Sequence, residues 1–399
     1  MTWRTKLLKD VCAVNYGKSP KQVLSESGIY PVVGTGGVER LADSFIYSGQ
    51  SIVLGRKGTI DNPTFVDGKF WPIDTTFFLS DFVDVDVKFL FYAFSLKNLR
   101  ALNESTGVPS VSRGALSELV FDIPDSKKEQ KRISEILSTV DAAIGQTQAL
   151  IDKYGRIKRG LMQDLLTRGI DDNGNVRTKE THKFTVKNGI EIPAEWSIVT
   201  LGDLLGKNGF VQTGPFGTQL HSYEYVQEGI PSIMPQDMFE KISTKNINRI
   251  SEAKANQLKR HRVRENDVIF ARRGDLSRCN VIEATQKGWL CGTGCILLRQ
   301  NQRVINPHWL RLFYQSFYGQ LQISINAVGS TMQNLSGALL KGLWLFCIDI
   351  KEQDRVVEKL TEIDKTIKML TDNRAKLESI KKGLMQDLLT GETRVVREI

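Results

Sequence analysis

The sequence has 399 residues, of which 41% are hydrophobic and 25% charged, as in a globular protein with two or three domains. The formal net charge of +9 favours a polyanionic partner such as nucleic acid, although many cytosolic proteins are basic without one. No segment approaches the roughly 18 apolar residues of a membrane span, and the opening MTWRTKLLKD lacks the apolar core of a signal peptide. Five cysteines do not fit a disulfide framework, so we expect a cytoplasmic location.

Residues 1–125 are predicted to form a mixed α/β domain. The runs SIVLGRKGTI and TFVDGKFWPIDTTFFL are rich in strand-forming residues and are broken by Gly, Pro and Asp turns. The aromatic stretch KFLFYAF, which starts at Lys88, predicts a short helix. The length of this region lies within the usual range of a single domain.

Residues 126–169 are predicted to form one long helix. Ser126 and Glu129 have the spacing of a capping box, in which the serine accepts a backbone N–H and the glutamate reaches back to the cap. Gly169 is well placed to end the helix. About 40 helical residues span roughly 60 Å. Apolar residues recur at steps of three and four, with Thr147 interrupting them: Ile133, Leu137, Val140, Ile144, Ile151 and Tyr154.

The second half of the chain follows the same plan. Residues 170–190 are polar and charged and are predicted to be a linker. Residues 191–348 are predicted to form a second mixed α/β domain, with strands in DVIFARRG and WLCGTGCILLR and a helix that starts at Asn306-Pro307. A second long helix over 349–391, with a seam of Val356, Leu360, Ile363, Ile367 and Leu370, precedes a tail over 392–399.

The two halves are an internal tandem repeat. The segment KEQKRI…GLMQDLLT from Lys128 aligns without a gap to KEQDRV…GLMQDLLT from Lys351, and about half of the positions are identical. Upstream the relation is fainter: GQSIVLGRKGT from Gly49 parallels ENDVIFARRGD from Glu265, and the Gly-Ala-Leu at Gly114 parallels the one at Gly337. The helices are therefore closely related, and the domains have diverged.

Four motifs mimic enzyme sites, and each has a simpler interpretation. Asn62-Pro63-Thr64-Phe65 lacks the second proline of an adenine-methyltransferase motif and is better explained as a turn before a strand. Pro124-Asp125 with Glu129 and Lys131 mimics a nuclease pattern, but the helix cap accounts for Glu129. Gly34-Thr35-Gly36-Gly37 lacks the Lys-Ser/Thr of a phosphate loop and predicts a hairpin turn.

The cysteines are the fourth case. Cys291 and Cys295, with Cys279, have a spacing that zinc could use. They align with Pro72 and Thr76, which we place in one strand of the first half, so small buried strand residues explain them at less cost. His182, His221, His261 and His308 show no ligand or triad spacing. The sequence therefore predicts no catalytic residue and no metal site.

The duplication itself has a functional consequence. Two closely related helices offer two equivalent docking sites for one kind of partner, whereas two divergent domains meet two different targets. If the target is duplex DNA, the recognition site is split and asymmetric, and the helices set the separation of its halves. A helical dimerisation stalk is the alternative. For the seam between the helices we expect Leu137, Val140, Ile144, Leu360, Ile363 and Ile367.

The order of domain, KEQKRI…GLMQDLLT helix, domain and KEQDRV…GLMQDLLT helix resembles the specificity subunits of type I restriction–modification enzymes over essentially the whole chain. Its most specific parts are the helix starts at Glu129-Gln130 and Glu352-Gln353 and the helix endings at Leu161 and Leu384. The resemblance implies two target-recognition domains, joined by two long helices that form an antiparallel coiled coil. It also implies docking of two methyltransferase subunits, which recruit restriction subunits.

The same resemblance implies that the chain is a non-catalytic, DNA-binding subunit without a cofactor of its own. S-adenosylmethionine would then belong to the methyltransferase subunits, and ATP and magnesium to the restriction subunits. A self-contained methyltransferase or nuclease and a structural coiled-coil adaptor are the alternatives.

The candidate DNA contacts are polar or basic residues in turns and loops. Basic residues at the end of a strand can grip phosphate or fork onto guanine. For each single residue, a solvated surface charge is the alternative interpretation. The first domain contributes Arg56, Lys57, Ser110, Ser112 and Arg113, and the second contributes Thr218, Gln219, Arg260, Arg262, Arg272, Arg273, Gln333 and Asn334.

Overall fold

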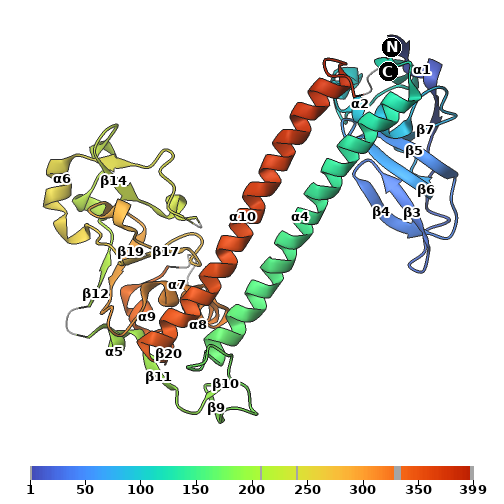
Figure 1. Cartoon of the computed structure of the whole chain (residues 1–399). Helices are drawn as coiled ribbons and strands as arrows, with labels where there is room; N and C mark the ends of the chain where they lie inside the picture. Colours follow the sequence, from blue (N-terminus) through green and yellow to red (C-terminus); the bar gives the residue numbers. More distant parts are fainter. Residues whose placement is uncertain (1, 207–208, 240, 328–333, 396–399) are drawn as a thin grey trace. The chain divides into compact units, whose positions relative to one another are not determined.

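The computed structural model describes residues 2–206, 209–239, 241–327 and 334–395 (Figure 1). It divides into two compact units, of which unit 1 combines segments from both ends of the sequence and unit 2 is one continuous segment. Unit 1 consists of Met1–Leu150 and Leu370–Ile399, and unit 2 of Ile151–Met369. Among the described residues, no helix combines the length and the apolarity that crossing a membrane requires.

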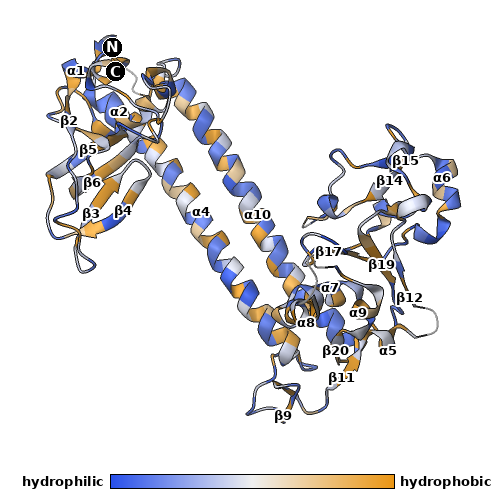
Figure 2. Ribbon diagram, turned by 180° about the vertical axis from the view of Figure 1, so that it is seen from behind, coloured by the Kyte–Doolittle hydropathy of each residue, from blue (hydrophilic) through white to orange (hydrophobic). Residues whose placement is uncertain are grey.

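The two predicted long helices are confirmed. Helix α4 spans Lys127–Thr167 and helix α10 spans Ile350–Leu389, and both alternate polar and apolar residues along their length (Figure 2). Glycines with positive φ follow them, Gly169 at +68° and Gly391 at +78°, where a left-handed conformation ends a helix at little cost.

Helices α4 and α10 pack together in opposite directions within each unit. In unit 1, Lys381 Nζ lies 2.7 Å from Asp141 Oδ1, and in unit 2, Lys158 Nζ lies 2.5 Å from Asp364 Oδ1. Within unit 1, Arg374 also donates to Gln148, and within unit 2 the Ile170 N–H just beyond α4 donates to Glu352 Oε1 at 2.8 Å. In each unit, therefore, the residue numbers fall along α10 as they rise along α4. Asp141 and Asp364 are equivalent in the repeat, as are Lys158 and Lys381, so both units contain the same ion pair.

Unit 1 is built on a six-stranded sheet in the order β2-β7-β5-β6-β3-β4 and a two-stranded sheet β1-β8. The central strand β5 pairs with β6 on one side and β7 on the other, and β3 pairs with β6 in parallel. The strands are β1 (Trp3–Leu7), β2 (Ala13–Tyr16), β3 (Tyr30–Gly34), β4 (Gly37–Ala42), β5 (Tyr47–Gly55), β6 (Thr64–Pro72), β7 (Thr76–Ser80) and β8 (Val120–Pro124). The short helices are α1 (Leu8–Val11), α2 (Val87–Phe94), the 3-10 turn η1 (Leu99–Leu102) and α3 (Arg113–Ser117).

The core of unit 1 joins the sheet to both long helices. Phe89 of α2 is fully buried, and Leu137 of α4 and Leu388 and Leu389 of α10 belong to the same apolar cluster. Burying each such side chain contributes about 1.5–3 kcal/mol relative to exposure. The domain is therefore attached to the helices by a continuous core.

The described residues of unit 2 form four small sheets. Two are pairs, β10-β9 and β11-β20, and two have four strands, β12-β19-β16-β17 and β13-β15-β14-β18. The strands are β9 (Phe184–Lys187), β10 (Ile190–Pro193), β11 (Ser197–Thr200), β12 (Phe210–Thr213), β13 (Tyr225–Val226), β14 (Ile230–Ile233), β15 (Arg249–Ile250), β16 (Val268–Ala271), β17 (Cys279–Val281), β18 (Leu290–Cys291), β19 (Cys295–Arg299) and β20 (Trp344–Cys347). The helices and 3-10 turns are α5 (Leu201–Leu205), η2 (Gly217–Gln219), η3 (Ser222–Glu224), η4 (Pro235–Asp237), α6 (Glu252–Gln257), η5 (Lys259–His261), η6 (Ala284–Gln286), α7 (Pro307–Gln315), α8 (Phe317–Ala327) and α9 (Gly337–Gly342).

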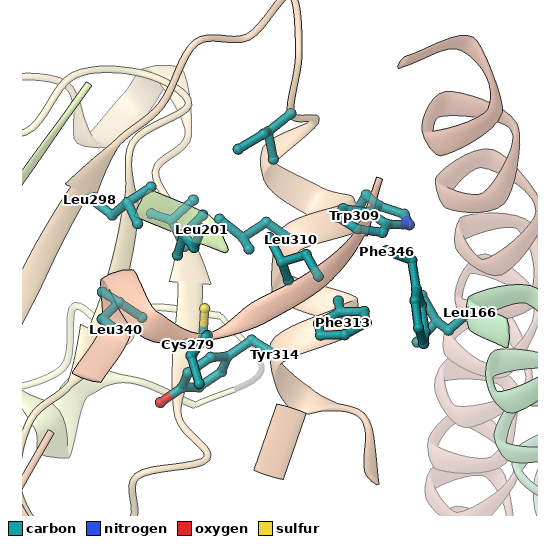
Figure 3. Packing of buried hydrophobic residues seen from close by; sticks show 14 of the residues in the cluster. Leu166, Leu201, Cys279, Leu298, Trp309, Leu310, Phe313, Tyr314, Leu340 and Phe346 are labelled. Carbon is teal, nitrogen blue, oxygen red and sulfur yellow. The ribbon is translucent and has the colours of Figure 1, made fainter. Parts of the chain in front are cut away.

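The core of unit 2 is centred on α7. Trp309, Leu310, Phe313 and Tyr314 of this helix are nearly fully buried (Figure 3). They belong to one cluster with Leu166 of α4 and with residues of β17, β19, β20 and α10. Helix α7 begins as the sequence predicts, because the Asn306 side chain accepts the His308 N–H at 2.8 Å and Pro307 follows it.

The strand order of the six-stranded sheet in unit 1 recurs in the four-stranded sheets of unit 2, although the domain sequences have diverged. The order β2-β7-β5-β6 of unit 1 matches β12-β19-β16-β17 of unit 2. The parallel pairing of β3 with the end of β6 at Pro72 likewise matches that of β14 with β18 at Cys291. One sequence-based assignment was wrong: Cys291 and Cys295 lie in two strands, β18 and β19, as Pro72 and Thr76 lie in β6 and β7.

The predicted role of Glu129 in a capping box was also wrong. The Glu129 N–H does reach Ser126 Oγ at 3.4 Å, but the Glu129 side chain is fully buried and its carboxylate pairs with Arg394. The Oε1–Nε distance is 2.5 Å and the Oε2–Nη2 distance is 2.7 Å. A sequence pattern local to the helix could not show that the chain returns to this point 265 residues later.

Glu352 makes the equivalent contact in unit 2, where both of its carboxylate oxygens accept hydrogen bonds from Arg177. Arg177 lies in the segment predicted as a linker, 170–190. In the structure this segment connects α4 to the second domain but is partly folded: Ile170 and Arg177 are buried, and β9 begins at Phe184.

Candidate nucleic-acid interface

The predicted residues of unit 1 come together on two adjoining loops, one after β5 and one before α3. Lys57 and Ser110 form an isolated antiparallel bridge. The Val111 N–H donates to the Arg56 carbonyl at 3.0 Å, and the Gly58 N–H donates to the Pro109 carbonyl at 2.9 Å. These backbone bonds join two loops that are far apart in sequence into one surface.

The side chains on this surface differ in exposure and in whether their polar atoms are already hydrogen-bonded. Ser112 Oγ accepts the Ala115 N–H at 3.1 Å and donates to Glu104 Oε1 at 2.7 Å, so its hydroxyl is occupied by the cap of α3. Lys57 and Arg113 are exposed. Lys57 and Arg113 are therefore more available to a ligand than Ser112.

Arg56 is half-buried at the end of the central strand β5. Its guanidinium carbon lies 5.5 Å from the centroid of the Tyr16 ring, within range of a cation–π interaction. Tyr16 ends the edge strand β2 and is 47% exposed. Tyr16 is not among the predicted site residues, because its relation to Arg56 depends on the pairing of β2, β7 and β5.

The corresponding place in unit 2 is formed by Arg272, Arg273 and Asn334. The Leu335 N–H donates to the Arg272 carbonyl at 3.0 Å, and Arg272 Nε donates to Asn334 Oδ1 at 3.0 Å. Arg273 is exposed. Gln333, also predicted here, lies outside the described residues.

Thr218 and Gln219 lie in η2, beyond the end of β12, and both are exposed. The Gly214 N–H donates to the Cys295 carbonyl at 2.9 Å, and the Arg272 N–H donates to the neighbouring Gly294 carbonyl at 2.7 Å. The loop that carries Thr218 and Gln219 therefore leaves the sheet at the end where Arg272 lies.

Arg260 and Arg262 belong to a separate basic groove beside β12, which is lined by Phe210, Val211, Gln212, Lys259, Arg260, Arg262, Val263, Arg264 and Arg299. Arg262 is paired with Glu252, and Arg299 Nη2 lies 2.6 Å from Asp267 Oδ2. Lys259, Arg260 and Arg264 are exposed. Arg264 was not predicted, although it continues the basic run that starts at Lys259.

Two histidines of unit 2, His261 and His308, have lowered pKa values. Burial lowers the pKa of His261, within the basic run, and the neighbouring Arg260 lowers it further. Burial and the nearby Arg311 likewise lower the pKa of His308. Both imidazoles are therefore predominantly neutral near pH 7.

No disulfide links the five cysteines. All five are free, and burial raises the pKa of the Cys12 thiol to about 12 and those of Cys279, Cys291 and Cys295 above their ordinary value. Within the described residues, no group of three or more His, Cys, Asp or Glu is placed to hold a metal ion.

The other enzyme-like motifs have structural roles. Gly34 and Gly37 close the hairpin between β3 and β4, and Pro63 precedes β6, as the sequence predicts. Glu129, part of the nuclease-like pattern, is bound by Arg394. The arrangement that remains is a set of basic and polar loops at the strand ends of each unit, which suits recognition of DNA phosphates and base edges.

Comparisons with known proteins identify several that are similar to this chain. The family model described as "Type I restriction modification DNA specificity domain" matches residues 1–153. The type I restriction enzyme MjaVIII specificity subunit of Methanocaldococcus jannaschii is 24% identical over 321 residues, which cover 78% of this chain and 71% of the relative. The putative type I restriction enzyme MjaX specificity subunit of the same organism is 26% identical over 298 residues, 74% of this chain and 63% of the relative.

A solved structure shares the fold. The S subunit of a type I restriction–modification system from M. genitalium superposes with a TM-score of 0.65 at 17% identity, covering 98% of this chain and 96% of the other. The predicted resemblance is therefore confirmed by sequence, and the mixed α/β fold with two long packed helices is confirmed by structure.

Proposed function

We propose that this chain, a relative of the specificity subunits of type I restriction–modification enzymes, reads DNA for such an enzyme as its non-catalytic subunit. Each divergent domain would read one half of a split, asymmetric site. The observation that carries the proposal is that Arg56 and Arg272 occupy the same position in two domains whose surrounding side chains differ.

The helices would act as the spacer between the two halves of the site. Equivalent ion pairs, Lys381 with Asp141 in unit 1 and Lys158 with Asp364 in unit 2, join α4 to α10. Among the predicted seam residues, Leu137 and Leu360 are buried in the domain cores, and Val140, Ile144, Ile363 and Ile367 are half-buried. We propose that the half-buried four form the seam of an antiparallel coiled coil.

We further propose that the helices dock two methyltransferase subunits. A partner that binds twice needs the same exposed residues twice, and the helices provide them. Lys153, Ile157, Gly160 and Asp164 lie on one face of α4, and the identical residues Lys376, Ile380, Gly383 and Asp387 lie on α10. Ile157 and Ile380 are each 43% exposed, and open space lies in front of both glycines.

On this proposal S-adenosylmethionine is bound by the methyltransferase subunits, and ATP and magnesium by the restriction subunits that they recruit. The chain would act in the cytoplasm, where its DNA target is. A purified chain should then neither methylate nor cut DNA when it is given S-adenosylmethionine, or magnesium and ATP. Activity of a rigorously pure sample would contradict the proposal.

Methylation mapping tests the reading of a split site. The chain is expressed with a type I methyltransferase subunit from the same host, and methylated positions are mapped across the host DNA. We expect two short specific sequences separated by a fixed run of unspecified bases. Exchange of residues 1–125 for the matching domain of a relative should change one half alone. A continuous palindrome, or a change in both halves, would contradict the proposal.

Partner stoichiometry tests the docking. Ile157→Asp and Ile380→Asp should each lower the number of bound methyltransferase subunits from two to one, measured by the mass of the complex in native mass spectrometry. Leu150→Asp is the matched control, because Leu150 is equally exposed, at 42%, and its counterpart Asn373 is different. Loss of both subunits from either single variant, or loss caused by the control, would exclude this face.

A further inference from the structure

Two candidate DNA contacts, Arg56 and Arg272, occupy equivalent positions in the two units. Each immediately follows a central strand, β5 or β16, whose neighbours are β7 or β19 on one side and β6 or β17 on the other. Each is followed by a second basic residue, Lys57 or Arg273. The two positions differ in what holds the guanidinium.

The backbone at both arginines is fixed on two sides. The Arg56 N–H donates to the Thr75 carbonyl at 2.8 Å, and the Arg272 N–H donates to the Gly294 carbonyl at 2.7 Å. Thr75 and Gly294 each directly precede the next strand, β7 or β19. The arginine carbonyls accept the N–H of Val111 and of Leu335, both at 3.0 Å.

The accepting bond leads directly into a capped helix in both units. Ser112 follows Val111 and caps α3 by accepting the Ala115 N–H at 3.1 Å, and Ser336 follows Leu335 and caps α9 by accepting the Leu339 N–H at 3.0 Å. The arginines therefore project from a junction of strand and helix, which has little freedom, rather than from a flexible loop tip.

The guanidinium groups are oriented by side chains particular to each unit. That of Arg56 lies over Tyr16, and its Nε is shielded from solvent. That of Arg272 is held through Nε by Asn334 Oδ1. Nε is shielded or engaged in both cases, so the terminal nitrogens Nη1 and Nη2 are the donors left for a ligand.

Guanine is the base that matches these donors. Its major-groove edge presents two acceptors, O6 and N7, at the separation of an arginine fork, and this bidentate contact is the commonest specific one. The neighbouring Lys57 and Arg273 are exposed, as suits a phosphate contact, where position along the backbone matters more than the angle of approach.

We propose that Arg56 and Arg272 each read one guanine, one in each half of the split site, that Tyr16 and Asn334 orient them, and that Lys57 and Arg273 bind phosphate. This assignment rests on the proposed function, since it needs a DNA site read by both domains. It separates base-reading residues from phosphate-binding ones within a single basic loop.

Lysine substitution tests the assignment, because it keeps the charge and removes the fork. Arg56→Lys and Arg272→Lys are expressed in the complex with the methyltransferase, and the methylated sites are mapped. Each variant should lose about tenfold to a hundredfold of its preference for guanine at one position of one half-site. The unaltered half is an internal control for folding.

The neighbours and the orienting residues give the matching measurements. Lys57→Gln and Arg273→Gln should weaken binding to the mapped duplex equally for matched and mismatched sequences, with a shallower dependence on salt. Tyr16→Leu should relax the same guanine as Arg56→Lys, and Tyr16→Phe should restore it because the cation–π contact is kept. Melting temperatures of all variants show whether the fold is retained.

Three results would overturn the inference and leave the proposed function intact. The first is a wild-type site that lacks a G·C pair in either half. The second is an Arg56→Lys variant whose base preference is unchanged, and the third is an Arg56→Lys variant that loses affinity equally for all sequences. A wild-type complex that methylates no split site would instead contradict the proposed function, and the inference with it.

Discussion

Units 1 and 2 attach dissimilar domains to their helices through the same contacts. Gln130 of α4 accepts the Asp86 N–H at 2.6 Å and donates to the Pro124 carbonyl at 2.8 Å. Gln353 of α10 accepts the Asn306 N–H at 2.8 Å and donates to the Ile348 carbonyl at 3.1 Å. Both glutamines are almost fully buried.

The partners of these glutamines are backbone groups, and this explains how the domains diverged. A backbone N–H or carbonyl is present whatever the side chain, so the helix can keep one glutamine while the domain sequence changes around it. A buried amide that lost its partners would cost about 1–3 kcal/mol. The helix–domain junction is therefore maintained by the helix residue and by the local fold of the domain.

The two units differ most in the ion pairs of their buried glutamates, Glu129 and Glu352. Arg177, the partner of Glu352, has a side chain 9% exposed, whereas Arg394, the partner of Glu129, is 34% exposed. Arg177→Met should lower the free energy of unfolding by about 3–5 kcal/mol, because it leaves a carboxylate buried without a charge partner. Arg394→Met should cost about 1–3 kcal/mol, because water reaches that pair more easily.

Denaturant titration with unit-specific tryptophan fluorescence measures both losses. The matched control for the larger one is Arg177→Met with Glu352→Gln, which removes both charges and should recover part of the stability. Equal losses in the two units would show that exposure of the arginine does not set the cost.

For the glycines that end the long helices, as for the glutamate pairs, we expect substitution to cost more in unit 2 than in unit 1. A Cβ at Gly169, where φ is +68°, would overlap the side chains of Glu352, Trp196 and Arg177, whereas a Cβ at Gly391 would first meet the Trp3 ring at 3.1 Å. Gly391→Ala should cost about 1 kcal/mol for the left-handed backbone, and Gly169→Ala about 2–4 kcal/mol because it also displaces the ion pair. Thermal unfolding ranks the two variants, and the reverse order would show that the Glu352 pair yields without cost.

The ion pairs between the helices provide a finer comparison. Asp141 accepts the Tyr92 hydroxyl at 2.7 Å in addition to pairing with Lys381, whereas the residue of unit 2 equivalent to Tyr92 is Leu312. Asp364→Ala should therefore cost about 0.2–1 kcal/mol, as for an exposed pair, and Asp141→Ala about 1 kcal/mol more. In a Tyr92→Phe background the difference should vanish, which a double-mutant cycle measures. If the two costs still differ in that background, the difference does not come from the tyrosine hydroxyl.

The smallest expected effect is a dependence on pH that belongs to unit 2. All four histidines of the chain lie there. Burial lowers the pKa of His261 and of His308 in the folded state, so below the unfolded value of about 6.5 the unfolded chain binds more protons than the folded one. Unit 2 should lose stability as the pH falls below that value, and His261→Gln should flatten the loss in melting temperature between pH 7.5 and 5.5. Equal loss in wild type and variant would show that His261 does not contribute.

Much of the fold was decided by the sequence alone. The repeated helices were predictable, because a seam of apolar residues at steps of three and four, free of proline and followed by glycine, is a local property of the chain. The relation of Arg56 to Arg272 and of the loop before α3 to the loop before α9 was predictable too, because duplicated segments keep their alignment.

Contacts between distant segments were decided only by the tertiary structure. Nothing near Glu129 indicates Arg394, and nothing near Arg56 indicates Tyr16, because each pair forms only after the chain has returned to the same place. A buried carboxylate must find a charge partner wherever the fold brings one, and an arginine is oriented by whichever neighbour the sheet order places beside it. Local patterns therefore determined the helices and the strands, while the packing of those elements determined which side chains meet.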